Sequence, residues 1–139
     1  MNPAYARQAA ALYQQNSARG NVEDADAHQL TAMLFDAAID RIAQACSHIR
    51  HGDVAGKGRC VSRAVAIVNQ LRLSLDHDAG GELSRRLDAL YDYVTRRLLH
   101  GQLHGDTQAL EECVRLLSPL RDGWHGIRGA YLASQRAAS

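Results

Sequence analysis

Apolar residues recur at intervals of three and four along four stretches of the chain, the spacing that places side chains on one face of an α-helix. The pattern predicts helices over about residues 27–51, 54–76, 82–102 and 107–128. The core stripe expected in the first is Leu30, Leu34, Ala38, Ile42, Ala45 and Ile49. The most regular stripe, in the last, is Leu110, Cys113, Leu117, Leu120, Trp124, Ile127 and Tyr131. No stretch alternates like a half-buried strand, so the chain is predicted to be all-α.

Polar residues and breakers at the boundaries support these helices. Asp26, Asp53 and Asp106 are placed to accept backbone N–H bonds as N-caps of the first, second and fourth helices. Residues 78–81, Asp-Ala-Gly-Gly, are expected to form a turn before the third. Pro119 lies inside the last helix and is expected either to kink it, with the stripe keeping its register, or to split it in two.

Helices of about 20 residues joined by short connections pack as antiparallel neighbours. We therefore expect an up-down-up-down four-helix bundle over residues 25–128. Residues 1–24 carry only sparse apolar positions and are predicted to form a mobile N-terminal arm with at most one short helix. Residues 129–139 follow several glycines, which weaken a helix, and are predicted to fray.

Composition argues against several classes of protein. The 139 residues include 16 Lys+Arg and 15 Asp+Glu, so no field strong enough to gather nucleic acid or an acidic membrane is expected. No apolar run approaches the roughly 20 residues of a membrane span, and the first residues show neither a basic leader nor an apolar signal core. Cys46, Cys60 and Cys113 are widely spaced at apolar helical positions. We interpret them as reduced core residues, which fits a cytoplasmic protein.

The sequence offers little for catalysis or metal binding. His100 and His104 are spaced i, i+4, but glycines interleave them where the helix is expected to end. No carboxylate stands at the Glu-x-x-His spacing of di-iron bundles, and no GxSxG or phosphate-binding glycine loop occurs. We therefore predict a protein that is not an enzyme and has no metal or cofactor.

The first two predicted helices carry more apolar surface than one packed face requires. The surplus residues are Met33, Phe35, Ala37 and Ile39 in the first and Val65, Ile67 and Leu73 in the second. Such helices are either buried on two sides or expose a groove for another chain, and periodicity leaves both interpretations open.

An ordered series of motifs runs through the chain. It consists of Tyr13-Gln14-Gln15-Asn16, Gln29-Leu30 with Met33-Leu34-Phe35-Asp36, Ser74-Leu75-Asp76 with Gly80-Gly81-Glu82, Leu90-Tyr91-Asp92-Tyr93-Val94-Thr95-Arg96-Arg97-Leu98-Leu99, and Leu120-Arg121-Asp122-Gly123-Trp124. In this order and spacing it resembles the FliS family of flagellar secretion chaperones over about residues 5–128. The chain departs from that family at Ala37, where glycine is usual, at His100-Gly101-Gln102 and Gly105, and at Pro119.

The resemblance implies an elongated four-helix bundle in the bacterial cytosol that holds the disordered C-terminal segment of flagellin in hydrophobic grooves. Holding this segment prevents premature polymerisation, and the complex presents flagellin to the flagellar type III export gate. The expected binding mode is helix-in-groove, in which the client becomes helical as it binds. Neither nucleic acid nor membrane insertion is expected, and the resemblance leaves monomer and homodimer open.

The residues predicted to line the groove are Met33, Phe35, Ile39, Ile67, Leu71, Leu75 and Tyr93, with Tyr91 and Arg97 as polar edges. The arm residues Tyr5, Leu12 and Tyr13 are expected to fold over the empty groove until flagellin displaces them, or else to stay disordered. The alternative function is that of a non-catalytic bundle whose surplus apolar face joins two copies.

Overall fold

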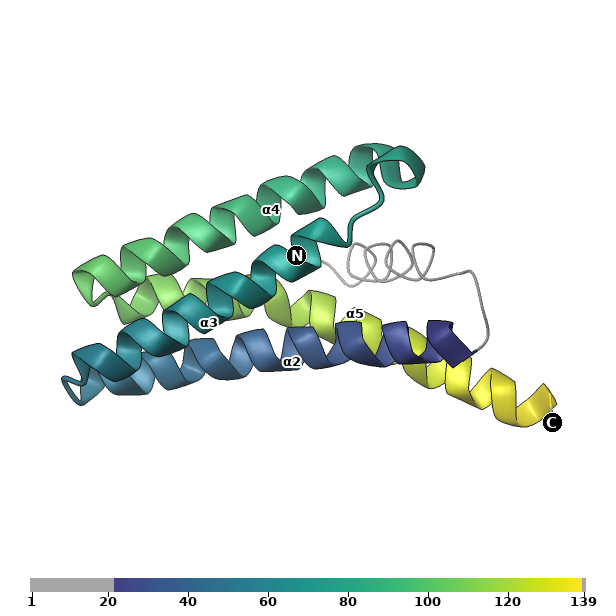
Figure 1. Cartoon of the computed structure of the whole chain (residues 1–139), viewed down its shortest axis with the longest axis horizontal. Coiled ribbons are helices and arrows are strands. Elements are labelled where there is room, and N and C mark those ends of the chain that lie inside the picture. The colour runs from purple at the N-terminus through teal and green to yellow at the C-terminus, as the bar shows by residue number, and fades with distance from the viewer. Residues whose placement is uncertain (1–21, 139) are drawn as a thin grey trace.

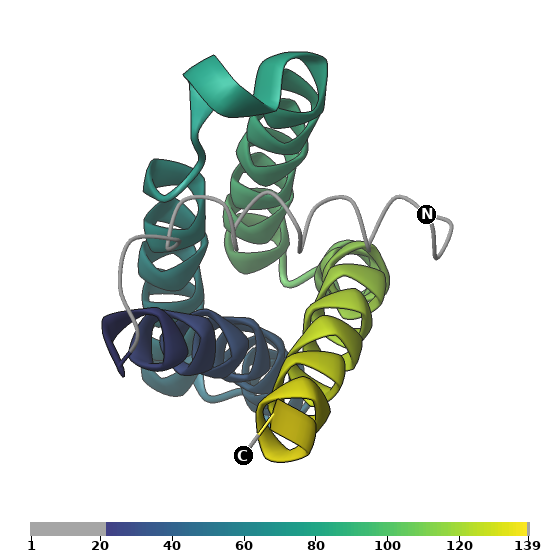
Figure 2. The same ribbon diagram turned by 90° about the vertical axis from the view of Figure 1, so that its right-hand side faces the viewer.

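The computed structural model of the chain describes residues 22–138. These residues form the helices α2 (Val22–Arg50), α3 (Val54–Leu73), α4 (His77–His104) and α5 (Thr107–Ala138), and no strand occurs among them. The helices pack as an elongated antiparallel bundle (Figure 1). In the end view, α2 packs against α3 and α5, and α4 lies diagonally opposite it between the same two neighbours (Figure 2). The predicted all-α bundle is confirmed.

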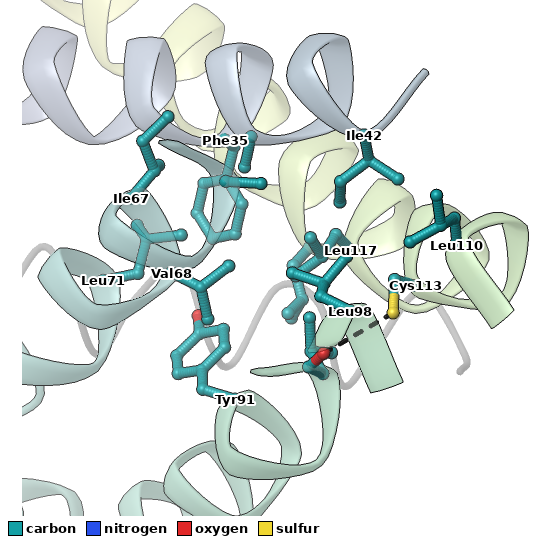
Figure 3. Packing of buried hydrophobic residues seen from close by; sticks show 14 of the residues in the cluster. Phe35, Ile42, Ile67, Val68, Leu71, Tyr91, Leu98, Leu110, Cys113 and Leu117 are labelled. Atoms are coloured by element: carbon teal, nitrogen blue, oxygen red, sulfur yellow. Dashed lines mark hydrogen bonds between the residues drawn. The ribbon is translucent and has the colours of Figure 1, made fainter. Parts of the chain in front are cut away.

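One hydrophobic core fills the space between the helices. The largest fully buried side chains are Trp124, Tyr91, Phe35, Ile42, Leu71, Leu87, Leu98, Leu110, Leu117 and Leu120. They come from all four helices, and Figure 3 shows how several of them point into the same space. Each helix therefore buries one stripe, as its three-and-four spacing requires.

The predicted N-caps of α3 and α5 are confirmed, and that of α2 is wrong. The Asp53 carboxylate accepts a hydrogen bond from the Gly56 backbone N–H at 2.9 Å. Asp106 accepts in the same way from the second and third backbone N–H groups of α5, at 3.0 and 3.3 Å. Asp26 lies inside α2, because this helix already begins at Val22.

The start of α4 differs from the predicted turn at residues 78–81. Asp76 accepts hydrogen bonds from two backbone N–H groups, those of Asp78 and Ala79, and so caps a helical turn that begins at His77. The turn ends at Gly81, whose φ of 52° is a conformation that glycine adopts without steric cost. The main part of α4 then follows, close to the predicted start at residue 82.

α5 is one helix that contains Pro119. Leu117, Leu120 and Trp124 are all buried, so the apolar stripe keeps its register across the proline, which agrees with the first of the two alternatives. The helix continues to Ala138, whereas the sequence predicted an end near residue 128. Alanine, leucine, glutamine and arginine dominate this last stretch, and all four are good helix formers.

Candidate functional site

More than half of the residues predicted to line a groove belong to the core. Phe35, Ile67, Leu71, Leu75 and Tyr91 are each at most 7% exposed. Figure 3 shows four of them pointing inward between the helices. Tyr91, predicted as a polar edge, is fully buried. In this arrangement these side chains stabilise the bundle, and their contact with another chain stays a prediction.

The other predicted groove residues do not share one surface. Met33 on α2 is 57% exposed, and Ile39 is half-buried against the core. Tyr93 and Arg97 of α4 instead both bind Glu112 of α5, the hydroxyl at 2.8 Å and the guanidinium at 2.9 Å. The predicted arm residues Tyr5, Leu12 and Tyr13 lie outside the described part of the chain.

The Glu112 cluster is an interhelical clamp. The hydrogen bonds from Tyr93 and then Arg97 lower the pKa of Glu112. The same carboxylate raises the pKa of the Tyr93 hydroxyl. Since Tyr93 and Arg97 both donate to Glu112, this cluster joins α4 to α5.

An exposed apolar strip on α2 offers a better surface for another chain. Leu30 and Met33 are 55% and 57% exposed, and Ala37, one turn further along, is half-buried. The three-and-four spacing of this strip continues through Arg41, Gln44 and His48, which line a pocket of about 400 Å³ together with Arg59, Cys60 and Arg63 of α3. The strip therefore lies on the face of α2 that borders α3.

Two contacts fix the register of α3 against this face. The Cys60 thiol of α3 donates to the Gln44 side-chain oxygen at 3.7 Å. One turn away, a Cβ at Gly56 would meet a ring atom of His48 at 2.5 Å, so the two helices nearly touch there. Extending this antiparallel register places Arg63 opposite Arg41.

We call the resulting surface the α2–α3 furrow. On α2 it comprises Leu30, Met33, Ala37, Arg41, Gln44 and His48. On α3 it comprises Arg59, Cys60, Arg63, Ile67 and Gln70, followed by the C-cap residue Ser74. Its half near the start of α2 is mostly apolar, and its half near the connection to α3 is basic. The furrow includes Met33 and Ile67 of the predicted groove residues. Sequence reasoning missed Leu30, because its spacing assigns it equally well to the core stripe.

Further exposed apolar side chains lie elsewhere on the bundle. Leu99 and Leu103 of α4 are 51% and 78% exposed and lie one turn apart, outside the core stripe of that helix. Leu73 of α3 is 85% exposed. These leucines lie outside the α2–α3 furrow, so Leu99 and Leu103 of α4 can serve as control positions.

The three cysteines occupy the core, as predicted. Cys46, Cys60 and Cys113 are buried and form no disulfide. Burial raises the pKa of Cys113 to about 12, and its thiol donates to the Val94 backbone oxygen at 3.7 Å (Figure 3). Such thiols are unreactive.

Within residues 22–138, no group of three or more metal-binding side chains comes together. The rings of His100 and His104 are tilted by 50° with their centroids 4.5 Å apart, and His100 pairs with Asp106 at 3.6 Å. None of the described helices has an apolar stretch long enough to cross a membrane.

Comparison with known proteins identifies the family. Residues 8–131 match the sequence model of the family described as flagellar protein FliS. The chain belongs to the FliS family. The chain is 42% identical over 116 residues to the flagellar secretion chaperone FliS of Salmonella typhimurium, which covers 83% of this chain and 86% of that protein.

Other FliS proteins match over a similar span. Identity is 37% over 123 residues with the flagellar secretion chaperone FliSB of Pseudomonas aeruginosa, covering 88% of this chain and 98% of the relative. Identity is 36% over 121 residues with FliS of Escherichia coli, covering 86% and 89%. The resemblance seen in the sequence motifs is thereby confirmed, and the FliS assignment makes this bundle a flagellar export chaperone.

Proposed function

We propose that this FliS-family chaperone binds the disordered C-terminal segment of flagellin along the α2–α3 furrow. In the bacterial cytosol, the bound segment cannot polymerise prematurely, and the complex is delivered to the flagellar type III export gate. The observation that carries the proposal is the exposed Leu30–Met33 pair at the apolar end of the furrow. The relatives, named flagellar secretion chaperones, support the export role. We propose no catalytic step and no cofactor.

The apolar half of the furrow suits an amphipathic helix. Such helices bind through anchors at spacings of three and four, which Leu30, Met33 and Ala37 match. Full burial of a leucine or methionine side chain is worth about 1.5–3 kcal/mol, so covering this half-exposed pair contributes about 2–3 kcal/mol. Ordering a disordered segment costs about 2–5 kcal/mol, so further contacts must add to the pair.

Among the predicted groove residues, the largely buried Ile67 lies nearest the furrow and could add such contacts, whereas Ile39 lies on the side of α2 opposite Leu30. Phe35, Leu71, Leu75 and Tyr91 would become accessible only if a helix moved, because they fill the core. The arm remains a proposed cover for the empty furrow, and flagellin would displace it.

The test is calorimetric titration with the host organism's flagellin, together with circular dichroism. A Leu30→Asp/Met33→Asp variant should bind about 30-fold more weakly or worse, as loss of about 2–3 kcal/mol implies. Leu103→Asp, an equally polar change on exposed α4, should bind like the wild type. All variants should keep the wild-type helicity.

Two results would contradict the proposal. One is undiminished binding by the Leu30→Asp/Met33→Asp variant while Leu103→Asp loses affinity, which would place the client on α4. The other is a folded wild type that does not bind flagellin and whose size rises with concentration, which would favour the self-associating bundle.

A further inference from the structure

The basic half of the α2–α3 furrow concentrates positive charge in a protein whose net charge is only +1. Arg41, Arg59 and Arg63 line one pocket of about 400 Å³ from two helices. The register of the helices sets Arg41 opposite Arg63, and Arg59 lies one turn from Arg63 on α3. Like charges one turn apart on a helix are mutually destabilising, so this arrangement costs the isolated bundle stability.

Among the side chains that the structure describes, no acidic group lies within ion-pair distance of Arg41, Arg59 or Arg63. Other arginines of the bundle do: Arg50, Arg72 and Arg97 reach carboxylates on neighbouring helices at 2.7, 2.6 and 2.9 Å. An unpaired guanidinium is therefore not the general condition of arginine in this fold.

The acids near the pocket are already engaged. Asp40 accepts a hydrogen bond from the Gln44 amide at 2.8 Å. Asp53 accepts from the Gly56 backbone N–H and pairs with His48 at 3.1 Å. The hydrogen bond from the Gly56 N–H is the main cause of the lowered pKa of Asp53. Arg59 lowers this pKa only through longer-range attraction to the carboxylate. Among the side chains that the structure describes, the three arginines of the pocket are thus left without a carboxylate in direct contact.

A guanidinium matches carboxylate geometry, because its planar N–H groups can donate two parallel hydrogen bonds. The basic half also continues directly from the apolar half along the same helix faces. From Met33 to Arg41 is eight residues, or about 12 Å along a helix at 1.5 Å per residue. A helical segment seated on the apolar half would therefore bring side chains two turns away to the arginines.

We propose that this pocket binds aspartate or glutamate side chains of the client, about two helical turns from the apolar anchors that cover Leu30 and Met33. The charge then fixes the direction of the segment in the furrow, since the reversed segment would leave the arginines without partners. This inference rests on the proposed function, and it adds a second contact, between acidic side chains of flagellin and the arginines of the furrow.

The test is titration of wild type, Arg41→Glu and Arg63→Glu with full-length flagellin at low and high salt. Each charge reversal should weaken binding about tenfold at low salt and reduce the salt dependence of the affinity. Arg115→Glu on α5 makes the same charge change at an exposed arginine and should leave both quantities unchanged. Circular dichroism checks that each variant is folded.

The outcomes separate this inference from the proposed function. If wild type binds flagellin and neither Arg41→Glu nor Arg63→Glu changes the affinity, the inference is overturned and the proposed function stands. If Arg115→Glu weakens binding as much as these two variants do, the effect is one of net charge, and the inference is overturned as well. Absence of wild-type binding would overturn both. Flagellin whose C-terminal acids are changed to amides should bind wild type and Arg63→Glu with equal affinity, and a persistent difference would count against the proposed contact.

Discussion

At the scale of single residues, the sequence does not show which glycines lie at close contacts between helices and which lie in open space. The sequence suggests that Gly101 loosens the end of a helix. In the structure, a Cβ at Gly101 would lie 2.8 Å from Leu110 Cδ2 and 3.1 Å from the Asp106 backbone oxygen. Because Leu110 is fully buried, a side chain at Gly101 would have no free space, and α4 and α5 pack closely at this point. Spacing alone carries no information on such close approaches.

Gly101→Ala should therefore lower the free energy of unfolding by about 1 kcal/mol. Overpacking costs about 1–3 kcal/mol, which exceeds the gain of up to about 1 kcal/mol from the better helix propensity of alanine. Gly126→Ala on α5 is the matched control, because nothing lies within 4 Å of its Cβ, and it should raise stability by about 0.5–1 kcal/mol. Urea unfolding measures both. Equal stabilisation by the two alanines would show that the contact at Gly101 is not tight.

At the scale of helices, periodicity and capping chemistry predicted most of the elements. Asp53 and Asp106 cap helices as expected because each stands beside a glycine that ends the preceding helix, with φ of 71° at Gly52 and 60° at Gly105. Asp26 was wrong as an N-cap because α2 begins before it, at Val22. The turn at residues 78–81 was wrong because Asp76 caps a helical turn that begins at His77. The position of such a cap depends on tertiary contacts such as the hydrogen bond from buried Ser84 to the Asp76 backbone oxygen at 2.9 Å.

The clamp between α4 and α5 makes one pH dependence testable. Tyr93 and Arg97 favour the charged form of Glu112, so its pKa in the folded protein lies below its ordinary value of 4.5. Its stabilising contribution is therefore complete above that ordinary value and is lost as the pH falls through the lower folded-state pKa. Glu112→Gln should lower the melting temperature at pH 7, and the difference from wild type should shrink toward pH 3.

The control for this clamp is Asp122→Asn, because the Asp122 side chain is 68% exposed on α5 and pairs with its sequence neighbour Arg121 rather than with another helix among the described side chains. This variant should melt close to the wild type at both pH values, since exposed pairs contribute little. If the difference in melting temperature between Glu112→Gln and wild type stays constant from pH 7 to pH 3, the charge on Glu112 does not stabilise the clamp.

At the scale of the whole molecule, the family and the bundle follow from the order of the motifs, but the binding surface does not. Spacing reveals that a helix has an apolar stripe without saying which stripe faces inward. Phe35 and Leu30 show the difference, because the first was assigned to the groove and is 1% exposed, whereas the second was assigned to the core and is 55% exposed. The furrow emerges only once the register of α2 against α3 is known.

The most direct test of the central claim is site-specific photo-crosslinking to flagellin. A photoreactive amino acid in place of Met33 lies on the furrow, and the same amino acid in place of Leu103 lies on exposed α4. We predict that position 33 crosslinks to the C-terminal segment of flagellin and that position 103 does not. Crosslinking from position 103 with none from position 33 would contradict the account.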